Sequence, residues 1–282
     1  MREPTVRKQN IQRDHLQRRL CCFVILALAL VICSCFAEYL CPYDPYQQDL
    51  SMAKAQPSWE HILGTDRYGR DMLSRVIIGS RTSIFSTLLL VSFITVLGSV
   101  IGIVCGWQGK RIDNMLMRLS DMFLAFPGLV FALAVAAALG GGVQNAIIAL
   151  AAVSWPKFAR VARSQTLVQK ESTYIRAARL AGCTTSRLIC KHIVPNIAGP
   201  ILVTAVLDIG TMMMELAGLS FLGLGAKPPV AEWGSMMSDT RNLLATHPWV
   251  TMAPGLAILG SVMVFNLLGD TLRDWLDPRN GR

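Results

Sequence analysis

Charged side chains are scarce in this sequence. Lys, Arg, Asp and Glu make up 16% of the 282 residues, whereas hydrophobic residues make up 52% and the mean hydropathy is +0.44. A water-soluble chain of this length would form one or two domains. The apolar residues instead gather into runs of about 20, the length that crosses a bilayer as a helix. The composition therefore predicts an all-α protein that crosses a membrane several times.

Motifs that carry catalysis are missing. The sequence has no HExxH pattern, no serine nucleophile elbow and no Cys/His spacing typical of a metal site. A GK pair at Gly109-Lys110 lacks the GxxxxGK(S/T) spacing of a phosphate-binding loop. We therefore expect no enzyme activity, no bound cofactor and no metal site in this chain. Any ATP hydrolysis must then occur in a partner subunit.

Disulfide bonds are not expected, although the chain has eight cysteines. Most of them lie in or beside apolar runs, where a free cysteine behaves as a small hydrophobic residue. Cys33 and Cys35 could together bind a soft metal, but we interpret them as filling a membrane span. Cys41 alone falls where we place the outside of the membrane.

The charge that is present is mainly positive, with a formal net charge of +9. The basic residues lie between apolar runs, without interleaved aromatics or a nucleic-acid motif, so we expect no nucleic-acid partner. Cytoplasmic loops of membrane proteins carry an excess of Lys and Arg. The basic segment 1–19 and the loop 163–195, in which Glu171 is the only acid, should therefore both lie inside. We expect both termini to be cytoplasmic.

Six apolar runs predict six membrane spans. We place them at about 20–40, 83–107, 114–139, 143–162, 196–223 and 251–269. The first span joins a cytoplasmic tail at 1–19 to an extracytoplasmic segment at 41–82. A core domain at 83–270 holds the other five spans, and a second cytoplasmic tail follows at 271–282. Pro127 should kink the third span.

The basic loop from Glu171 to Pro195 lies between two long apolar runs, and its sequence predicts two short helices. Ser172 or Thr173 can cap the first helix, and Gly182 suits its C-terminal end. The second helix should end near Val194, because the residue before a proline is pushed out of the α region. One face of the first helix is small and nearly all alanine; it consists of Tyr174, Ala177, Ala178 and Ala181.

Such a small helix between two spans suits insertion into a cleft of another protein. The alternative is a helix that lies on lipid, but this face lacks the Leu, Phe or Trp that such helices bury. We therefore interpret the loop as a docking element.

This loop resembles one in a known family. Ala177-Ala178, followed by Gly182 and Pro195, is similar to the EAA loop of bacterial ABC importer permeases. In that family the loop docks into a cytoplasmic ATPase and transmits its motion. The resemblance implies an ATPase-coupling loop at 172–195 with the residues Tyr174, Arg176, Ala177, Ala178, Gly182 and Pro195. This copy departs from the family pattern: Arg176 replaces a glutamate, His192 an isoleucine and Val194 a leucine.

A second motif resembles one branch of that family. Gly64-Thr65-Asp66 and Gly69-Arg70-Asp71 are similar to the GTDxxGRDxxSR signature of its peptide and nickel permeases. Later segments of the chain also resemble this branch, so the resemblance extends from Tyr43 to Pro278. Glycines permit tight turns, and the alternating charges of the motif can pair. We interpret the motif as a folded plug or elbow rather than a substrate site.

Two carboxylates lie inside the fifth predicted span. Asp208 and Glu215 are seven residues apart and therefore share one face of the helix. A charge near the bilayer centre costs about 2.5–3.5 kcal/mol, so such residues normally face the protein interior or a water-filled cavity. They either line a translocation path or bond to a neighbouring helix, for example at Asn266. The path is the favoured interpretation for Glu215.

The resemblance implies an ABC importer permease fold and a multi-pass protein of the bacterial cytoplasmic membrane. The chain would work in membrane lipid beside a second homologous permease. An extracytoplasmic binding protein would deliver nickel or a di- or oligopeptide, and cytoplasmic ATPase subunits would drive transport. The alternative is a secondary, ion-coupled transporter that uses Asp208 and Glu215. Such transporters usually have two repeated halves with paired broken helices, which this sequence does not show.

Overall fold

The computed structural model describes the backbone of residues 3–276, and within this range the secondary structure is helical. A single isolated bridge, between Thr65 and Asp71, is the exception. The outermost residues of the two predicted tails, 1–2 and 277–282, lie outside the described residues. The all-α prediction is confirmed. The helices are α1 (Glu3–Cys35), α2 (Ala37–Leu40), α3 (Met72–Gln108), α4 (Lys110–Leu124), α5 (Gly128–Ala138), α6 (Val143–Lys170), α7 (Thr173–Leu180), α8 (Thr185–Leu188), α9 (Val194–Phe221), α10 (Trp233–Thr240) and α11 (Pro248–Leu276).

Four helical segments are long and apolar enough to cross a membrane. They are His15–Cys35 within α1, all of α3, a continuous run from Thr185 to Phe221, and α11. The pair α4 and α5 forms a fifth candidate if it is taken as one bent span. Helix α6 falls short of the same test of length and composition, because polar and basic residues are spread along it.

The third predicted span is broken rather than kinked. Helix α4 ends at Leu124, α5 begins at Gly128, and the two helices meet at 89°. Pro127 disfavours the α conformation at the residue before it, so the first helix stops and a new one starts. Aromatic rings fill the corner: Phe126 stacks on Phe131, and Phe123 packs edge-on against Phe131 and Trp155. The sequence therefore predicted a bend at the right proline, but it underestimated the bend, because the helix is interrupted there.

The second helix of the basic loop does not end near Val194, and that prediction was wrong. A π-helical turn, Ile189–Ile193, links α8 to α9, and Val194 keeps helical angles (φ −52°, ψ −50°). Pro195 occupies the first turn of α9, where its missing N–H is tolerated. The wide π turn before it relieves the collision between the proline ring and the preceding turn.

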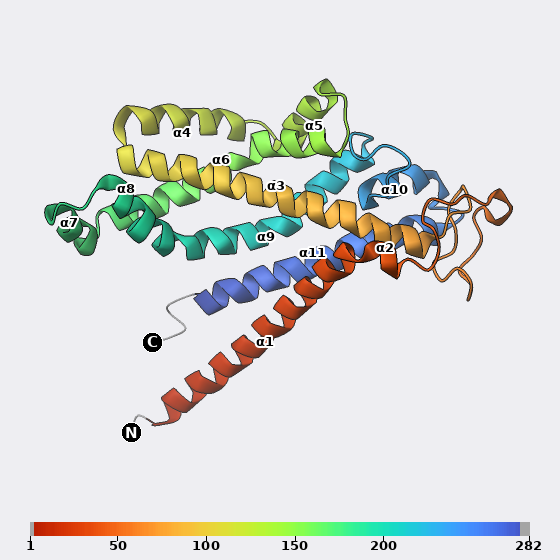
Figure 1. Ribbon diagram of the computed structural model, residues 1–282, viewed down its shortest axis with the longest axis horizontal. Coiled ribbons are helices and arrows are strands. Elements are labelled where there is room, and N and C mark those ends of the chain that lie inside the picture. Colours follow the sequence, from red (N-terminus) through yellow and green to blue (C-terminus); the bar gives the residue numbers. More distant parts are fainter. Residues whose placement is uncertain (1–2, 277–282) are drawn as a thin grey trace.

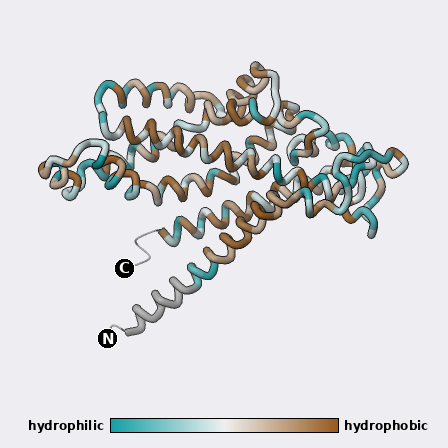
Figure 2. The backbone as a smooth tube through the Cα atoms, viewed as in Figure 1, coloured by the Kyte–Doolittle hydropathy of each residue, from teal (hydrophilic) through white to brown (hydrophobic). Residues whose placement is uncertain are grey.

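The long helices run between two distinct ends of the molecule. Helix α1 begins and α11 ends toward the end that carries α7 and α8 (Figure 1). The loop after α2 lies near α10 at the other end (Figure 1). Hydrophobic residues line the long helices between the ends, and hydrophilic residues gather in the loop after α2 (Figure 2). The basic loop and the GTD motif are therefore separated by the length of the bundle.

Three glycines bring α3 and α6 into close contact. Gly98, Gly102 and Gly106 recur at every fourth residue and form a small-residue stripe along α3. A Cβ atom on Gly102 would lie 2.3 Å from the carbonyl oxygen of Ala159, which no side chain can occupy without movement of the backbone. The backbone of α6 therefore rests directly on this stripe.

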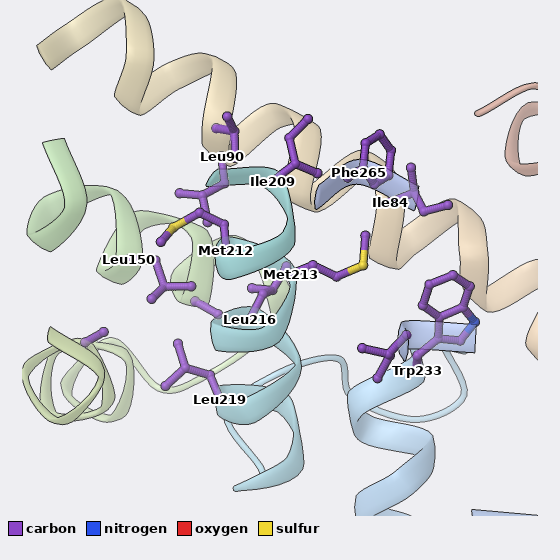
Figure 3. Close-up of a cluster of buried hydrophobic side chains, with 14 of the residues drawn as sticks. Ile84, Leu90, Leu150, Ile209, Met212, Met213, Leu216, Leu219, Trp233 and Phe265 are labelled. Carbon is purple, nitrogen blue, oxygen red and sulfur yellow. The ribbon is translucent and has the colours of Figure 1, made fainter. Parts of the chain in front are cut away.

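Helix α9 lies at the centre of the main hydrophobic cluster (Figure 3). Its buried residues Met212, Met213, Leu216 and Leu219 pack among side chains from the surrounding helices. These include Ile84 and Leu90 of α3, Leu150 of α6, Trp233 of α10 and Phe265 of α11. The two carboxylates of α9 are thus held on a helix that is fixed by neighbours on several sides.

Candidate functional site

Helix α7 is anchored by one buried residue that sequence reasoning missed. The Ile175 side chain is completely buried. It belongs to a second hydrophobic cluster, separate from the main core and made of Ala162, Ile175, Leu188, Ile193, Ile197 and Ile201. Residues from α6, α8 and α9 contribute to this cluster, so α7 folds back onto the bundle. The buried position of Ile175 could have been predicted, because an isoleucine is unusual in an otherwise basic loop.

The opposite face of α7 is exposed. Ala177 and Ala181 are open to solvent, Tyr174 is 42% exposed and Leu180 is 91% exposed. Ala178, which the sequence placed on the same small face, is the exception, because it packs partly against the second cluster. Leu180 was not predicted, and it adds a fully exposed apolar side chain beside the alanines. The exposed surface of α7 that consists of Tyr174, Ala177, Leu180 and Ala181 is called the knob face.

The predicted ends of α7 are present in part. Ser172 occupies the N-cap position, but its hydroxyl donates to the carbonyl of Gln169 (2.5 Å) instead of capping the helix. Gly182 has φ +81° with open space around it, as expected for the residue that ends a helix. Arg176 forms an exposed ion pair with Glu171 (2.5 Å), a type that contributes little stability.

Tyr174 also joins the helices on either side of α7. Its hydroxyl donates to the side-chain oxygen of Gln169 at 2.7 Å and accepts from the Asn196 side chain at 3.1 Å. The same Asn196 amide donates to the carbonyl of His192 at 2.6 Å, in the π turn. The end of α6 and the start of α9 are therefore linked through one residue of the loop.

Trp107, at the end of α3, holds the loop from a third side. The Arg179 guanidinium of α7 lies 5.1 Å from its ring centroid, and the Lys170 ammonium of α6 lies 5.7 Å from it. Lys170 also donates to the Trp107 carbonyl at 2.5 Å. The loop that contains α7 is therefore in contact with α3, α6 and α9.

Basic residues at every third position of α6 pair with carboxylates of neighbouring helices. Arg163 binds Asp113 of α4 through both carboxylate oxygens, and Arg160 binds Asp121 of α4 at 2.5 Å. Lys157 pairs with Asp208 of α9. These partners are far apart in the sequence, which is why sequence reasoning did not connect them.

The two carboxylates of α9 differ in their surroundings. The Asp208 side chain is completely buried, and its Oδ1 accepts from the Lys157 ammonium, whereas its Oδ2 is buried without a hydrogen-bond partner among the described residues. The suggested partner Asn266 instead lies against Gly210, where a Cβ would sit 2.3 Å from its side-chain oxygen. Glu215 is half-buried and makes no hydrogen bond or ion pair with any described residue; Asp208 and Lys157 are the charges that act on it.

Metal-ligating side chains do not converge in the part of the chain that the structure describes. No group of three or more His, Cys, Asp or Glu residues is arranged to hold an ion there.

The GTD motif forms a folded elbow before α3. Asp66 accepts from the backbone N–H of Arg70 (3.0 Å) and from its guanidinium (2.6 Å), so charges of the motif do pair, as expected. Asp71 caps α3 through the N–H of Ser74 (2.7 Å) and contacts His61 at 2.9 Å. Gly69 has φ +74°, and a Cβ there would lie 1.7 Å from the carbonyl oxygen of Asp49.

Known proteins with similar sequences are permeases. Residues 98–282 match the family described as binding-protein-dependent transport system inner membrane component. The chain is 41% identical to the nickel transport system permease protein NikC of Escherichia coli (strain K12), covering 92% of this chain and 93% of the relative. It is 39% identical to the dipeptide transport system permease protein DppC of Alkalihalophilus pseudofirmus, covering 91% and 84%. It is 40% identical to the glutathione transport system permease protein GsiD of Pectobacterium atrosepticum, covering 95% and 88%.

A solved structure shares the fold. The MetNI methionine ABC transporter, in an inward-facing conformation, superposes with a TM-score of 0.59 at 18% identity, covering 72% of this chain and 97% of that chain. The resemblance found in the sequence is thus confirmed over most of the chain. The chain belongs to the family of binding-protein-dependent transport system inner membrane components, in the branch that holds the dipeptide and nickel permeases.

Proposed function

We propose that this chain is one of two membrane subunits of an ATP-driven importer that carries short peptides or nickel. Its relatives are named as permeases for dipeptides, glutathione and nickel. The observation that carries the proposal is the basic loop 172–195, which presents an exposed knob face and is tied to three long helices. This loop would receive the force of a separate ATPase and pass it to the bundle. ATP would be bound and hydrolysed in that partner.

In this proposal the chain crosses the membrane six times, with both ends in the cytoplasm. The crossings are α1, α3, the bent pair α4 and α5, α6, α9 and α11. Helix α6 is the most polar of them, but its basic residues pair with carboxylates of α4 and α9, which lowers the cost of placing charge inside a membrane. The start of α1 and the end of α11 both lie toward the end that carries α7, which supports this orientation (Figure 1).

A second permease and a binding protein complete the proposed complex. Lys157 and Arg160 of α6 remain half exposed in the isolated chain. Charged side chains at membrane depth avoid lipid, so we place this face against the second permease or the water-filled path between the two subunits. An extracytoplasmic binding protein would approach the opposite end, where the GTD elbow and α10 lie.

The docking of the ATPase is tested by substitution in the knob face. Ala177→Arg places a long cation on an exposed alanine, whose removal costs the fold little because the side chain is open to solvent. We expect normal amounts of inserted protein but loss of ATPase from the purified complex and loss of uptake. Arg176→Glu restores the glutamate that the family carries at this position and should keep both. Full ATPase association by the Ala177 variant would contradict the docking role of this loop.

A further inference from the structure

Asp208 and Glu215 lie on one face of α9, and the charge of Lys157 of α6 acts on both carboxylates. Asp208 is fully buried and pairs with Lys157, while Glu215, two turns further along α9, has no hydrogen-bond partner among the described residues. The nearest other basic residues of α6 are already matched, because Arg160 pairs with Asp121 and Arg163 with Asp113. With all three groups ionised, the site carries a net charge of −1.

The Lys157–Asp208 pair differs from a purely structural clamp. The guanidinium of Arg163 engages both oxygens of Asp113, which fixes the geometry of α6 against α4. Lysine is a point charge on a flexible stem, and Lys157 reaches one oxygen of Asp208 and leaves the other buried without a partner in the described chain. Half of the Lys157 side chain is exposed, on the face that the proposed path would share.

We propose that Lys157 sets the charge preference of the translocation path. It neutralises Asp208 and leaves Glu215 as one uncompensated carboxylate, so the path attracts a substrate that brings a single positive group, such as the ammonium of a peptide. Without Lys157 the same path would present two negative charges and favour more positive substrates. This inference rests on the proposed transport function and assigns a specificity-determining residue to it.

A series of variants changes the site charge in unit steps. Lys157→Met gives −2, Asp208→Asn and Glu215→Gln each give 0, and the double variant Lys157→Met/Asp208→Asn returns to −1. Arg81→Met is the control, because it removes a half-exposed cation that pairs with Glu38 and leaves the charges of α6 and α9 unchanged.

The measurement is uptake by the full complex in vesicles, with ATPase and saturating binding protein, normalised to assembled complex. The probes are Ala-Ala, Lys-Ala and Ni²⁺. Among the probes that the complex transports, we expect Lys157→Met to raise uptake of the more positive one by on the order of tenfold relative to the parent. This is the effect of one charge at about 10 Å in a site with an effective dielectric constant of about 20. The neutral variants should lower it by a similar factor. The double variant and Arg81→Met should match the parent.

Uptake that is unchanged across the series, with less assembled complex for Lys157→Met and Asp208→Asn, would overturn the inference and make the pair a structural tie. A double variant that stays as different from the parent as the Lys157 variant would overturn it as well. A parent complex that transports none of the probes would overturn the proposed function, and this inference with it.

Discussion

Single residues at the two ends of the bundle are held in contrasting ways. At the GTD end, Asp66 and Asp71 each accept several hydrogen bonds from backbone and side chains, which fixes the elbow before α3. At the loop end, Tyr174 and Trp107 connect helices through a few side-chain contacts, several of them exposed. The first arrangement suits a rigid support, and the second suits a joint that moves with a partner.

Cys41 gives a residue-scale test of orientation. Its thiol is partly buried and donates to the carbonyl of Ala37 at 3.1 Å. Burial, reinforced by the nearby carboxylate of Asp71, raises the pKa of the thiol above its ordinary value. Because the thiolate is the reactive form, labelling of a thiol with a raised pKa is slow at neutral pH and accelerates about tenfold per unit as pH rises toward that pKa.

We therefore expect a membrane-impermeant maleimide to label a variant that retains only Cys41 in intact cells, faster at pH 8.5 than at pH 7. Variants that retain only Cys183 or only Cys190, in the basic loop, should be labelled only after the membrane is permeabilised. Labelling of Cys183 from outside at either pH would reverse the proposed orientation and remove the argument for ATPase docking.

At the scale of elements, α3 connects the two ends. Asp71 caps its first turn, and Lys170 and Arg179 contact Trp107 at its last turn. Between them the glycine stripe seats α3 on α6, the helix that leads directly into α7. Helices α3 and α6 therefore form a closely packed pair between the GTD elbow and the basic loop.

Gly102 tests that unit. A Cβ there would lie 2.3 Å from the carbonyl oxygen of Ala159, so Gly102→Ala must push the two helices apart. We expect a loss of about 1–3 kcal/mol in the free energy of unfolding, typical of overpacking. Unfolding of the purified protein in detergent measures it. Gly260→Ala, a helical glycine with no atom within 4 Å of the added Cβ, is the control and should be neutral or slightly stabilising. Equal stability of the Gly102 variant would show that the contact is loose.

Sequence patterns predicted the elements better than their connections. Apolar runs located the long helices, and the positive φ of Gly182 followed from its place after a helix. The break at Pro127 and the continuous helix through Pro195 were missed, because a proline's effect depends on whether the neighbouring turns can widen or stop. The pairing of Asp208 with Lys157 was also missed, since it joins helices that are distant in sequence. The glycine stripe could have been predicted from its four-residue spacing.

At the scale of the whole molecule, the chain is a multi-pass inner-membrane component, and the proposed function gives separate tasks to the two ends of its helical bundle. The loop end would take up the work of an ATPase, and the GTD end would meet the binding protein. The bundle between them carries the α9 carboxylates. An ion-coupled transporter would instead use these carboxylates to bind and release its coupling ion, and would need no knob face.

The source of energy separates these two accounts most directly. The measurement is uptake of Ala-Ala, Lys-Ala or Ni²⁺ into vesicles that contain the full complex, with binding protein outside and ATP inside, with and without ionophores that collapse ion gradients. For an ATP-driven importer, we expect uptake that requires both ATP and binding protein and persists when every ion gradient is collapsed. Uptake that continues without ATP and stops with the ionophores would contradict it.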